Sequence, residues 1–308
     1  MEKDSRVFIA GEETSIGTAL FKQCTEEGYT HVVGSAGKSV DLTNPAAVER
    51  FFSQFNPEYI FLVAGKAGGI LANQKYPADL MIDNLLVACN VIRSSFRCGA
   101  KKLFYLASSC SYPRDCPQPM KEKHLLTGAL EPTNEAYAVA KIAGIKLCQA
   151  YRQQYGANFI VGIPANVFGP LDDFSEDNSH VIAALLRRMH EAGFAGADVF
   201  EVWGTGNPRR EFIYVDDLAS ASIFLMNHYD GSEPINIGTG ENVSISELAR
   251  TIKEVTNYNG KISFDASKPD GMPIKVLDTS KIRDLGWSAN ASLRRGIELT
   301  YEWLKIQR

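Results

Sequence analysis

The first half of the chain alternates short apolar segments with longer segments whose apolar residues recur at helical spacing. Strands that alternate with helices pair in parallel, because each crossover between parallel strands needs a connection of helix length. The order therefore predicts an α/β fold, a doubly wound parallel sheet (Rossmann) with helices on both faces. The predicted strands span residues 6–10, 31–34, 59–64, 102–107 and 158–164, and the helices between them residues 16–28, 45–55, 77–98 and 134–155.

Composition and charge exclude several other classes of protein. The 308 residues are 45% hydrophobic and 22% charged, which is typical of globular domains and not of disordered, collagen-like or coiled-coil chains. A formal net charge of −4 gives no basic surplus for a nucleic-acid partner. No segment resembles a signal peptide or a membrane span, so we expect a cytoplasmic protein. The six cysteines form no CxxC pair and no metal-ligand pattern, so we expect reduced thiols and no metal site.

A glycine-bearing turn separates the first predicted strand from the first helix. Gly11 and Gly17 enclose five residues at the position where backbone N–H groups of a helix N-terminus can receive a pyrophosphate. Thr14 replaces the central glycine of the usual spacing, and Glu12 and Glu13 occupy a turn that should face phosphates. A tight turn that binds no ligand is the alternative interpretation of this motif alone.

Tyr137 and Lys141 are four residues apart on a predicted helix, so their side chains share one face. A cation there can lower the pKa of the phenol and make it a usable proton donor and acceptor. Such pairs are also common on solvated helices. Ser108 favours the catalytic interpretation, because it follows the strand 102–107 at the edge where open parallel sheets bind ligands. Cys110 lies in the same strand-end segment, where an isolated cysteine usually only packs.

Together these features resemble the extended short-chain dehydrogenase/reductase family of nucleotide-sugar enzymes (NAD-dependent epimerase/dehydratase), and within it the GDP-L-fucose synthase branch. The resemblance runs almost from end to end. It is carried by residues 65–70, 108–110, 134–144, 164–170, 178–181 and 203–212.

The resemblance implies epimerisation of GDP-4-keto-6-deoxy-D-mannose at C3 and C5, followed by reduction of its C4 ketone to give GDP-L-fucose. It implies that Cys110 is the base and His180 the acid of the epimerisation. For the reduction, it implies that Tyr137 protonates O4, Ser108 holds that oxygen and Lys141 binds the nicotinamide ribose.

The resemblance also implies a set of contacts to the GDP-sugar. Arg187 lies seven residues after His180, two helical turns along one face, so it could reach a diphosphate. Arg188 is expected to face elsewhere, and core packing is an equal alternative for Trp203. The implied substrate contacts are Asn166, Arg187, Trp203, Arg210 and Asp270.

The implied cofactor is NADP(H), with NADH possible. Bacterial members of the branch carry arginines that suit a 2′-phosphate, whereas this chain has acidic residues in the first turn and small residues after the second strand. We expect Lys38 to contact the 2′-phosphate, with Ser35 as a hydroxyl donor. No acidic residue ends the second strand to bind a ribose 2′-hydroxyl, so NADPH is favoured, by a modest margin. The implied cofactor contacts are Gly11, Thr14, Ser15, Ile16, Gly17, Lys38, Asp41, Leu42, Leu106, Ala107, Lys141, Pro164, Asn166, Val167 and His180.

The strand and helix rhythm becomes irregular after residue 164, which predicts a second domain. We expect residues 1–165 to form the dinucleotide-binding domain, with returning segments near 212–238, and residues 166–308 to form mostly a smaller α/β substrate domain. A loop is predicted at residues 167–178. Further strands are predicted at 200–203, 212–215, 234–237 and 261–265, and helices at 180–192, 217–226, 244–257 and 292–306.

The partners and two alternative functions remain open at this point. The resemblance implies a homodimer packed through the helices 77–98 and 134–155. One alternative is a related epimerase-reductase of a GDP-colitose or GDP-heptose pathway, and the other is a dinucleotide-binding regulator without catalysis. A regulator has no need of an acid–base set, and a sugar dehydratase would carry an Asp-Glu pair where this chain has Ser109 and Cys110.

Overall fold

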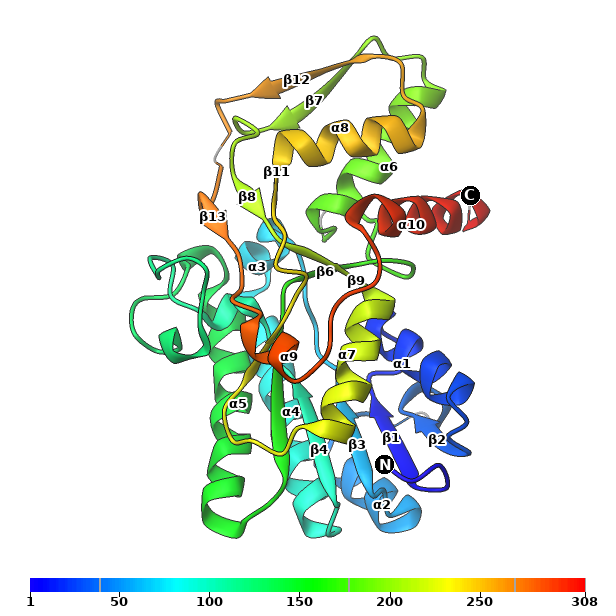
Figure 1. Ribbon diagram of the computed structural model, residues 1–308, viewed down its shortest axis with the longest axis vertical. Coiled ribbons are helices and arrows are strands. Elements are labelled where there is room, and N and C mark those ends of the chain that lie inside the picture. Colours follow the sequence, from blue (N-terminus) through cyan, green and yellow to red (C-terminus); the bar gives the residue numbers. More distant parts are fainter. Residues whose placement is uncertain (39, 177, 269, 308) are drawn as a thin grey trace.

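The structure is a computed structural model that describes residues 1–38, 40–176, 178–268 and 270–307. A parallel sheet forms the centre of a lower lobe, which lies beneath a smaller upper lobe (Figure 1). The neighbouring strands of this sheet are all parallel, in the order β10-β5-β4-β3-β1-β2. The predicted doubly wound α/β fold is confirmed. The six strands are β1 (Arg6–Ala10), β2 (His31–Gly34), β3 (Tyr59–Leu62), β4 (Lys102–Leu106), β5 (Phe159–Pro164) and β10 (Ile235–Ile237).

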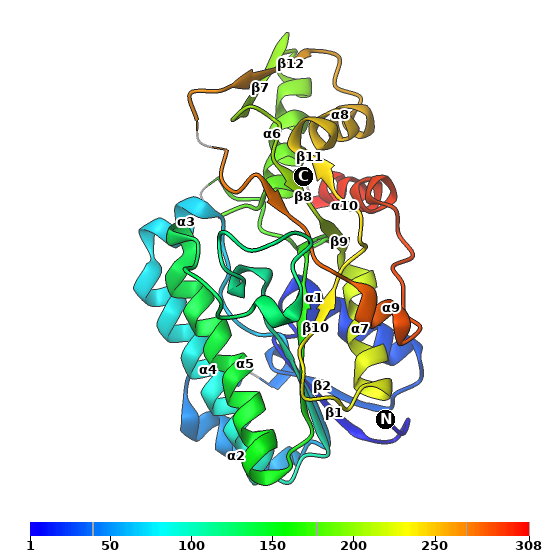
Figure 2. The same ribbon diagram turned by 60° about the vertical axis from the view of Figure 1, so that its left-hand side comes forward.

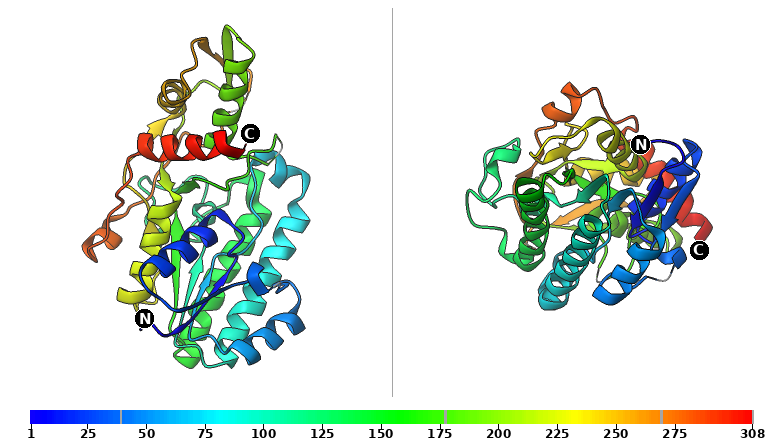
Figure 3. Two further views of the ribbon diagram at one scale, coloured as in Figure 1. Left: turned by 90° about the vertical axis from the view of Figure 1, so that its right-hand side faces the viewer. Right: turned by 90° about the horizontal axis from the view of Figure 1, so that it is seen from below.

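Helices cover both faces of the sheet (Figures 2 and 3). The strands read as continuous apolar runs because both of their faces are buried, and every residue of β4 and β5 is buried. α1 (Ser15–Glu26) and α7 (Val215–His228) pack together on one face, while α2 (Pro45–Phe55), α4 (Pro77–Arg97) and α5 (Glu135–Tyr155) cover the other. No helix among the described residues is long and apolar enough to cross a membrane.

The upper lobe is assembled from the C-terminal part of the chain. It contains helices α6 (Val181–Phe194), α8 (Ile245–Thr256) and α10 (Leu293–Gln307), the parallel pair β7 (Val199–Trp203) and β12 (Lys261–Asp265), and the small sheet β11 (Val243–Ser244), β8 (Arg209–Arg210) and β13 (Ile274–Lys275). β6 (Asn166–Phe168) and β9 (Phe212–Tyr214) form a further parallel pair.

Several short elements differ from the sequence-based expectation. Residues 167–178 were expected to form a loop, but β6 continues to Phe168 because β9 supplies a pairing partner that is distant in the sequence. Sequence patterns also missed β8, β11, β13 and the short helices α3 (Ile70–Lys75) and α9 (Ser280–Asp284). Strands of two residues and helices of less than two turns carry too few positions for a periodic pattern to identify them.

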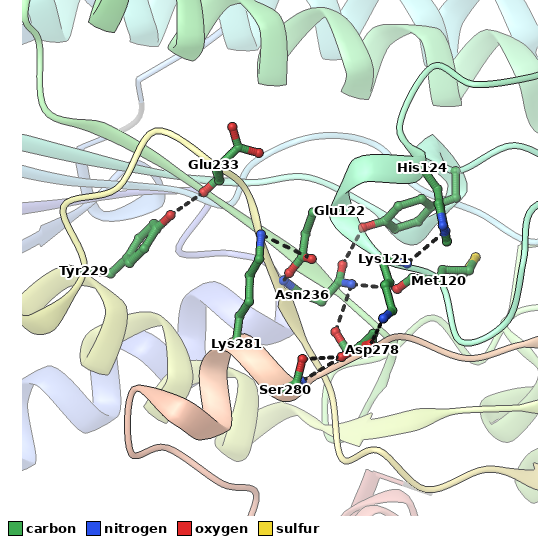
Figure 4. A network of polar contacts seen from close by, with 11 residues as sticks. Met120, Lys121, Glu122, His124, Tyr229, Glu233, Asn236, Asp278, Ser280 and Lys281 are labelled. Atoms are coloured by element: carbon green, nitrogen blue, oxygen red, sulfur yellow. Dashed lines mark hydrogen bonds and ion pairs between the residues drawn. The ribbon is translucent and has the colours of Figure 1, made fainter.

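A buried polar network ties the loop after β4 to β10 and to the segment that precedes α9 (Figure 4). Asn236, which is fully buried in β10, donates from Nδ2 to the carbonyl oxygens of Met120 at 2.9 Å and Asp278 at 3.1 Å. Its Oδ1 accepts the hydroxyl proton of Tyr112 at 2.6 Å. Its backbone N–H donates to Oε1 of buried Glu122 at 3.1 Å. One side chain therefore joins three separate stretches of the chain.

Replacing Asn236 with alanine leaves two carbonyl groups and one hydroxyl without this partner. We expect the Asn236→Ala substitution to lower the free energy of unfolding by about 2–4 kcal/mol, because unpaired buried polar groups lose solvation without compensation. Urea unfolding followed by circular dichroism measures the change. Gln54→Ala, on the exposed side of α2, is the control and should change stability by less than ~0.5 kcal/mol. Equal stability of the two variants would contradict this role of Asn236.

Candidate active site

Two glycines close the turn between β1 and α1. Gly11 has a φ of +103°, and a Cβ on it would lie 2.5 Å from the backbone nitrogen of Ala64, just after β3. A Cβ on Gly17 would lie 1.9 Å from the carbonyl oxygen of Gly11. Thr14 caps α1, and its Oγ1 accepts the N–H of Gly17 at 3.1 Å. The turn lies at the carboxyl ends of β1 and β3, the switch point of the sheet, and its shape fits a dinucleotide pyrophosphate.

The other residues expected to contact a cofactor are distributed along the carboxyl edge of the sheet. Lys38 is exposed in the 3₁₀ turn η1 (Ala36–Lys38). The remaining ones are Ser15 and Ile16 at the start of α1, Asp41 and Leu42 before α2, Leu106 and Ala107 at the end of β4, and Pro164, Asn166 and Val167 around the start of β6.

Tyr137 and Lys141 lie on α5 and reach the end of β4. Nζ of buried Lys141 donates to the carbonyl oxygen of Leu106 at 3.3 Å and lies 5.8 Å from the centre of the Tyr137 ring. Burial lowers the pKa of Lys141 to about 8. Burial also raises the pKa of Tyr137 above its ordinary value, and a hydrogen bond with Ser108 opposes this only in part. The pKa of the phenol is therefore raised, and not lowered as expected from Lys141, because desolvation is the largest influence on it.

The thiol of Cys110 is held by two donors. Cys110 lies in the 3₁₀ turn η2 (Ser109–Ser111), and its backbone N–H donates to Oγ of Ser108 at 3.2 Å. Its Sγ accepts Nδ2 of Asn134 at 3.2 Å and Nζ of Lys275 at 3.5 Å. Asn134 directly precedes α5, but its side chain does not cap that helix. An amide that would ordinarily cap a helix is thus used to position a sulfur atom.

His180 directly precedes α6 and is electrostatically linked to the same lysine. The neighbouring backbone is fixed by a hydrogen bond of 2.9 Å from the Gly69 N–H to the Asn178 carbonyl oxygen. Although part of His180 is exposed, the protein around its ring removes hydrating water. This desolvation, followed by the positive charge of Lys275, lowers the pKa of His180. Lys275 therefore connects the thiol of Cys110 with the imidazole of His180.

Three of the residues expected to contact a GDP-sugar lie in the upper lobe around β8. Asp270 accepts the backbone N–H and the hydroxyl proton of Thr205, both at 2.7 Å, and its charge acts on Arg210. Arg210 in β8 lies opposite Lys275 in β13. Trp203, at the end of β7, is 55% exposed, so the alternative of core packing is wrong.

Arg187 and Arg188 line one pocket of the upper lobe. Nη1 of Arg187 lies 3.0 Å from Glu191 and 3.7 Å from Glu176. Arg188 was expected to face elsewhere, and its contacts are with β7 instead of the two glutamates that Arg187 contacts. Its guanidinium stacks over Phe200 at 4.9 Å, and Nη2 donates to the Glu201 carbonyl oxygen at 2.8 Å.

Sequence reasoning missed two donors of the site. Asn134 lies within the block 134–144 that carried the resemblance, so that block could have indicated it. Lys275 lies 165 residues after Cys110 in a two-residue strand, and no local pattern marks it.

A tyrosine, a lysine and a serine beside a dinucleotide turn define an oxidoreductase that uses a nicotinamide dinucleotide. The chain belongs to the NAD dependent epimerase/dehydratase family, whose model matches residues 7–238. It is 51% identical to GDP-L-fucose synthase 1 of Arabidopsis thaliana over an alignment of 302 residues. The alignment covers 98% of this chain and 94% of that protein.

Solved structures agree with this assignment. The fold matches a GDP-6-OMe-4-keto-L-xylo-heptose reductase from Campylobacter jejuni with a TM-score of 0.95 and 35% identity, over 100% of this chain and 99% of that chain. It also matches a GDP-L-fucose synthetase from Naegleria fowleri bound to NADP, with a TM-score of 0.90 and 28% identity, over 100% and 96% of the two chains.

The lowered pKa of Lys141 leads to a prediction about cofactor binding. We expect the affinity of the free protein for a nicotinamide dinucleotide to fall as the pH rises through about 8, because Lys141 then loses the proton that gives it its charge. Calorimetric titration between about pH 6.5 and pH 9.5 measures the dissociation constant. Lys141→Met should abolish this pH dependence, whereas Lys146→Met, an exposed lysine on the same helix, should keep it. An affinity that does not change across this range would show that the charge of Lys141 has no part in binding.

Proposed function

We propose that this protein converts GDP-4-keto-6-deoxy-D-mannose to GDP-L-fucose, by epimerisation at C3 and C5 and reduction at C4, with NADPH or NADH as the hydride donor. The observation that carries the proposal is the Cys110 thiol, held by Asn134 and Lys275 next to the Tyr137 phenol. Two proton-transfer groups with different chemistry thus share one site. The 51% identity to a GDP-L-fucose synthase supports the choice of substrate, and we propose a cytoplasmic location for the reaction.

The epimerisation needs a base on one face of the sugar ring and an acid on the other. Hydrogens on the carbons next to a ketone are acidic enough for a positioned base to remove. Cys110 takes this proton as the thiolate and becomes a neutral thiol, and the two donors on Sγ fix the position of the sulfur. His180 returns a proton from the opposite face. The hydroxyl of Ser108 stabilises the charge that develops on O4 in between.

The reduction uses the same oxygen. When bound, the reduced nicotinamide supplies the hydride that C4 receives. Tyr137 donates its phenolic proton to O4, and its raised pKa keeps it protonated until an alkoxide, a stronger base, is formed. Ser108 holds O4, and Lys141 positions the nicotinamide ribose.

The upper lobe supplies the charges for the nucleotide. Arg210 lies on β8, on the strand next to Lys275, and its guanidinium suits a diphosphate. Exposed Trp203 and Asp270 provide an aromatic face and a carboxylate for the sugar or base, and Arg187 lies further along α6. We propose that residues 1–165, with returning segments near 212–238, form the dinucleotide domain, and that residues 166–308 form mostly the substrate domain.

Product analysis tests the proposal directly. The purified protein is incubated with GDP-4-keto-6-deoxy-D-mannose and NADPH, and the product sugar is identified by NMR. GDP-L-fucose is expected. A different GDP-sugar, or turnover only of a colitose or heptose precursor, would assign the protein to a related pathway. Dinucleotide binding without any turnover would support the alternative of a regulator.

The two proton-transfer roles should separate in two variants. We expect Cys110→Ser to lose exchange of solvent deuterium into C3 and C5 while retaining a slow direct reduction of the unepimerised ketone. Tyr137→Phe should show the opposite pattern, with exchange retained and kcat for reduction lowered by about 10²–10⁴. Deuterium incorporation is followed by NMR and reduction by the loss of nicotinamide absorbance.

Cys89→Ser is the matched control, because this cysteine is exposed on α4, and it should behave as the native protein in both assays. Exchange at the native rate in Cys110→Ser would remove Cys110 from the mechanism. Reduction within tenfold of the native rate in Tyr137→Phe would remove Tyr137 as the proton donor.

We further propose a homodimer formed through α4 and α5. These helices pack against each other and lie on the outside of the lower lobe (Figure 2). Ile82 and Leu86, one turn apart on α4, are 49% and 37% exposed, and Val139 on α5 is 37% exposed. An apolar stripe on two adjacent helices suits a four-helix contact with a second copy of the chain.

The Ile82→Glu/Leu86→Glu variant should be a monomer, because charges in an apolar helix contact are desolvated without a partner. Sedimentation velocity measures the mass. Ile306→Glu, which changes an exposed apolar residue of α10, should remain a dimer. A native protein that sediments as a monomer would refute the proposal.

A further inference from the structure

The carboxylate of Glu12 lies at the end of β2. Its Oε2 accepts the backbone N–H of Gly37 at 3.2 Å, across the turn η1 that follows the strand. A Cβ built on Gly34, the last residue of β2, would lie 1.6 Å from Oε2 and 2.4 Å from Cβ of Glu12. The Glu12 side chain therefore fills the space that a side chain at position 34 would occupy.

This location has a defined meaning in a dinucleotide-binding sheet. An acidic residue at the end of the second strand accepts the ribose 2′-hydroxyl of NAD, whereas a cation there accommodates the 2′-phosphate of NADP. β2 ends in Gly34 and has no such residue of its own. Glu12 brings a carboxylate to the same position from the turn after β1, a contact that the sequence of β2 alone does not reveal.

The groups expected to bind a 2′-phosphate are not arranged to do so. The buried Ser35 hydroxyl accepts the N–H of Gly11 at 2.9 Å and donates its proton to Oε2 of Glu13 at 2.9 Å. Its only proton is therefore already used. Lys38 is the other residue expected to contact the 2′-phosphate. It is exposed at the end of η1, directly after Gly37, whose N–H donates to the Glu12 carboxylate.

We propose that Glu12 is a specificity-determining residue of the cofactor site. Its carboxylate accepts the ribose 2′-hydroxyl and disfavours a 2′-phosphate, so this protein binds NADH at least as tightly as NADPH. The inference rests on the proposed function for the presence of a dinucleotide site. It goes beyond that function by naming the residue that sets the choice between the two cofactors. A like charge near the 2′-phosphate weakens its binding by about tenfold at the effective dielectric of a protein surface.

Binding of fragments tests this without turnover. ADP-ribose and 2′-phospho-ADP-ribose, together with NADH and NADPH, are titrated calorimetrically into the native protein and into Glu12→Gln. The glutamine retains an oxygen for the Gly37 N–H, so the turn should be preserved. We expect the 2′-phosphorylated ligands to bind Glu12→Gln about tenfold more tightly than they bind the native protein, with no gain for ADP-ribose or NADH. Glu26→Gln, with the same change of charge at the other end of α1, should leave all four affinities unchanged.

Three results have distinct meanings. Native protein that binds NADPH more than tenfold more tightly than NADH, with no effect of Glu12→Gln, would overturn the inference. A native preference for NADPH that Lys38→Ala abolishes would overturn it as well and would assign the 2′-phosphate contact to Lys38. Failure of all four ligands to bind would instead refute the dinucleotide site on which the proposed function depends.

Discussion

The hydrogen bonds of Asn236 are the constraint on which the arrangement of the site depends. Asn236 belongs to the last strand of the parallel sheet, yet its side chain bonds to the loop after β4 and to the segment after β13. The first of these carries Cys110, and the second follows Lys275. Their sulfur and nitrogen atoms are 3.5 Å apart because both segments are anchored to one buried amide. The glutamate at position 211 reinforces this anchor, since its buried carboxylate accepts the N–H groups of Gly240 and Leu277 at 2.8 and 2.7 Å.

Burial sets the proton affinities of the site more than pairwise charges do. Tyr137 and Lys141 are both surrounded by protein, and desolvation shifts each toward its neutral form. For the phenol this favours the role of proton donor, because a neutral phenol is the form that can donate. The thiol of Cys110 is treated differently, since an amide and an ammonium both point at its sulfur. The site thus favours the neutral form of the Tyr137 phenol and surrounds the Cys110 sulfur with hydrogen-bond donors.

Long periodic elements could be predicted from the sequence, and short or distant contacts could not. The strands His31–Gly34 and Lys261–Asp265 have the predicted boundaries, which their apolar spacing indicated. The helix Pro45–Phe55 also has its predicted boundaries, because apolar spacing, a capping asparagine and a proline at the first helical position agree. The grouping of Ser108, Tyr137 and Lys141 follows from strand order and helical spacing. The contact of Lys275 with Cys110 depends on the path of a chain segment with no periodic pattern, and the Glu12 contact with Gly37 depends on the absence of a side chain at Gly34.

The crossing of the chain between the lobes has a consequence for how the protein is made. A ribosome delivers the six strands of the parallel sheet once Ile237 has emerged, and the family model that matches the chain ends one residue later. The ammonium that holds Cys110 and the carbonyl group that completes the bonds of Asn236 arrive only with residues 275 and 278. During synthesis the nascent chain can therefore hold a nearly complete nucleotide-binding sheet whose thiol still lacks one of its donors. The proposed proton-transfer site is therefore complete only when the last quarter of the polypeptide has folded back onto the first three quarters.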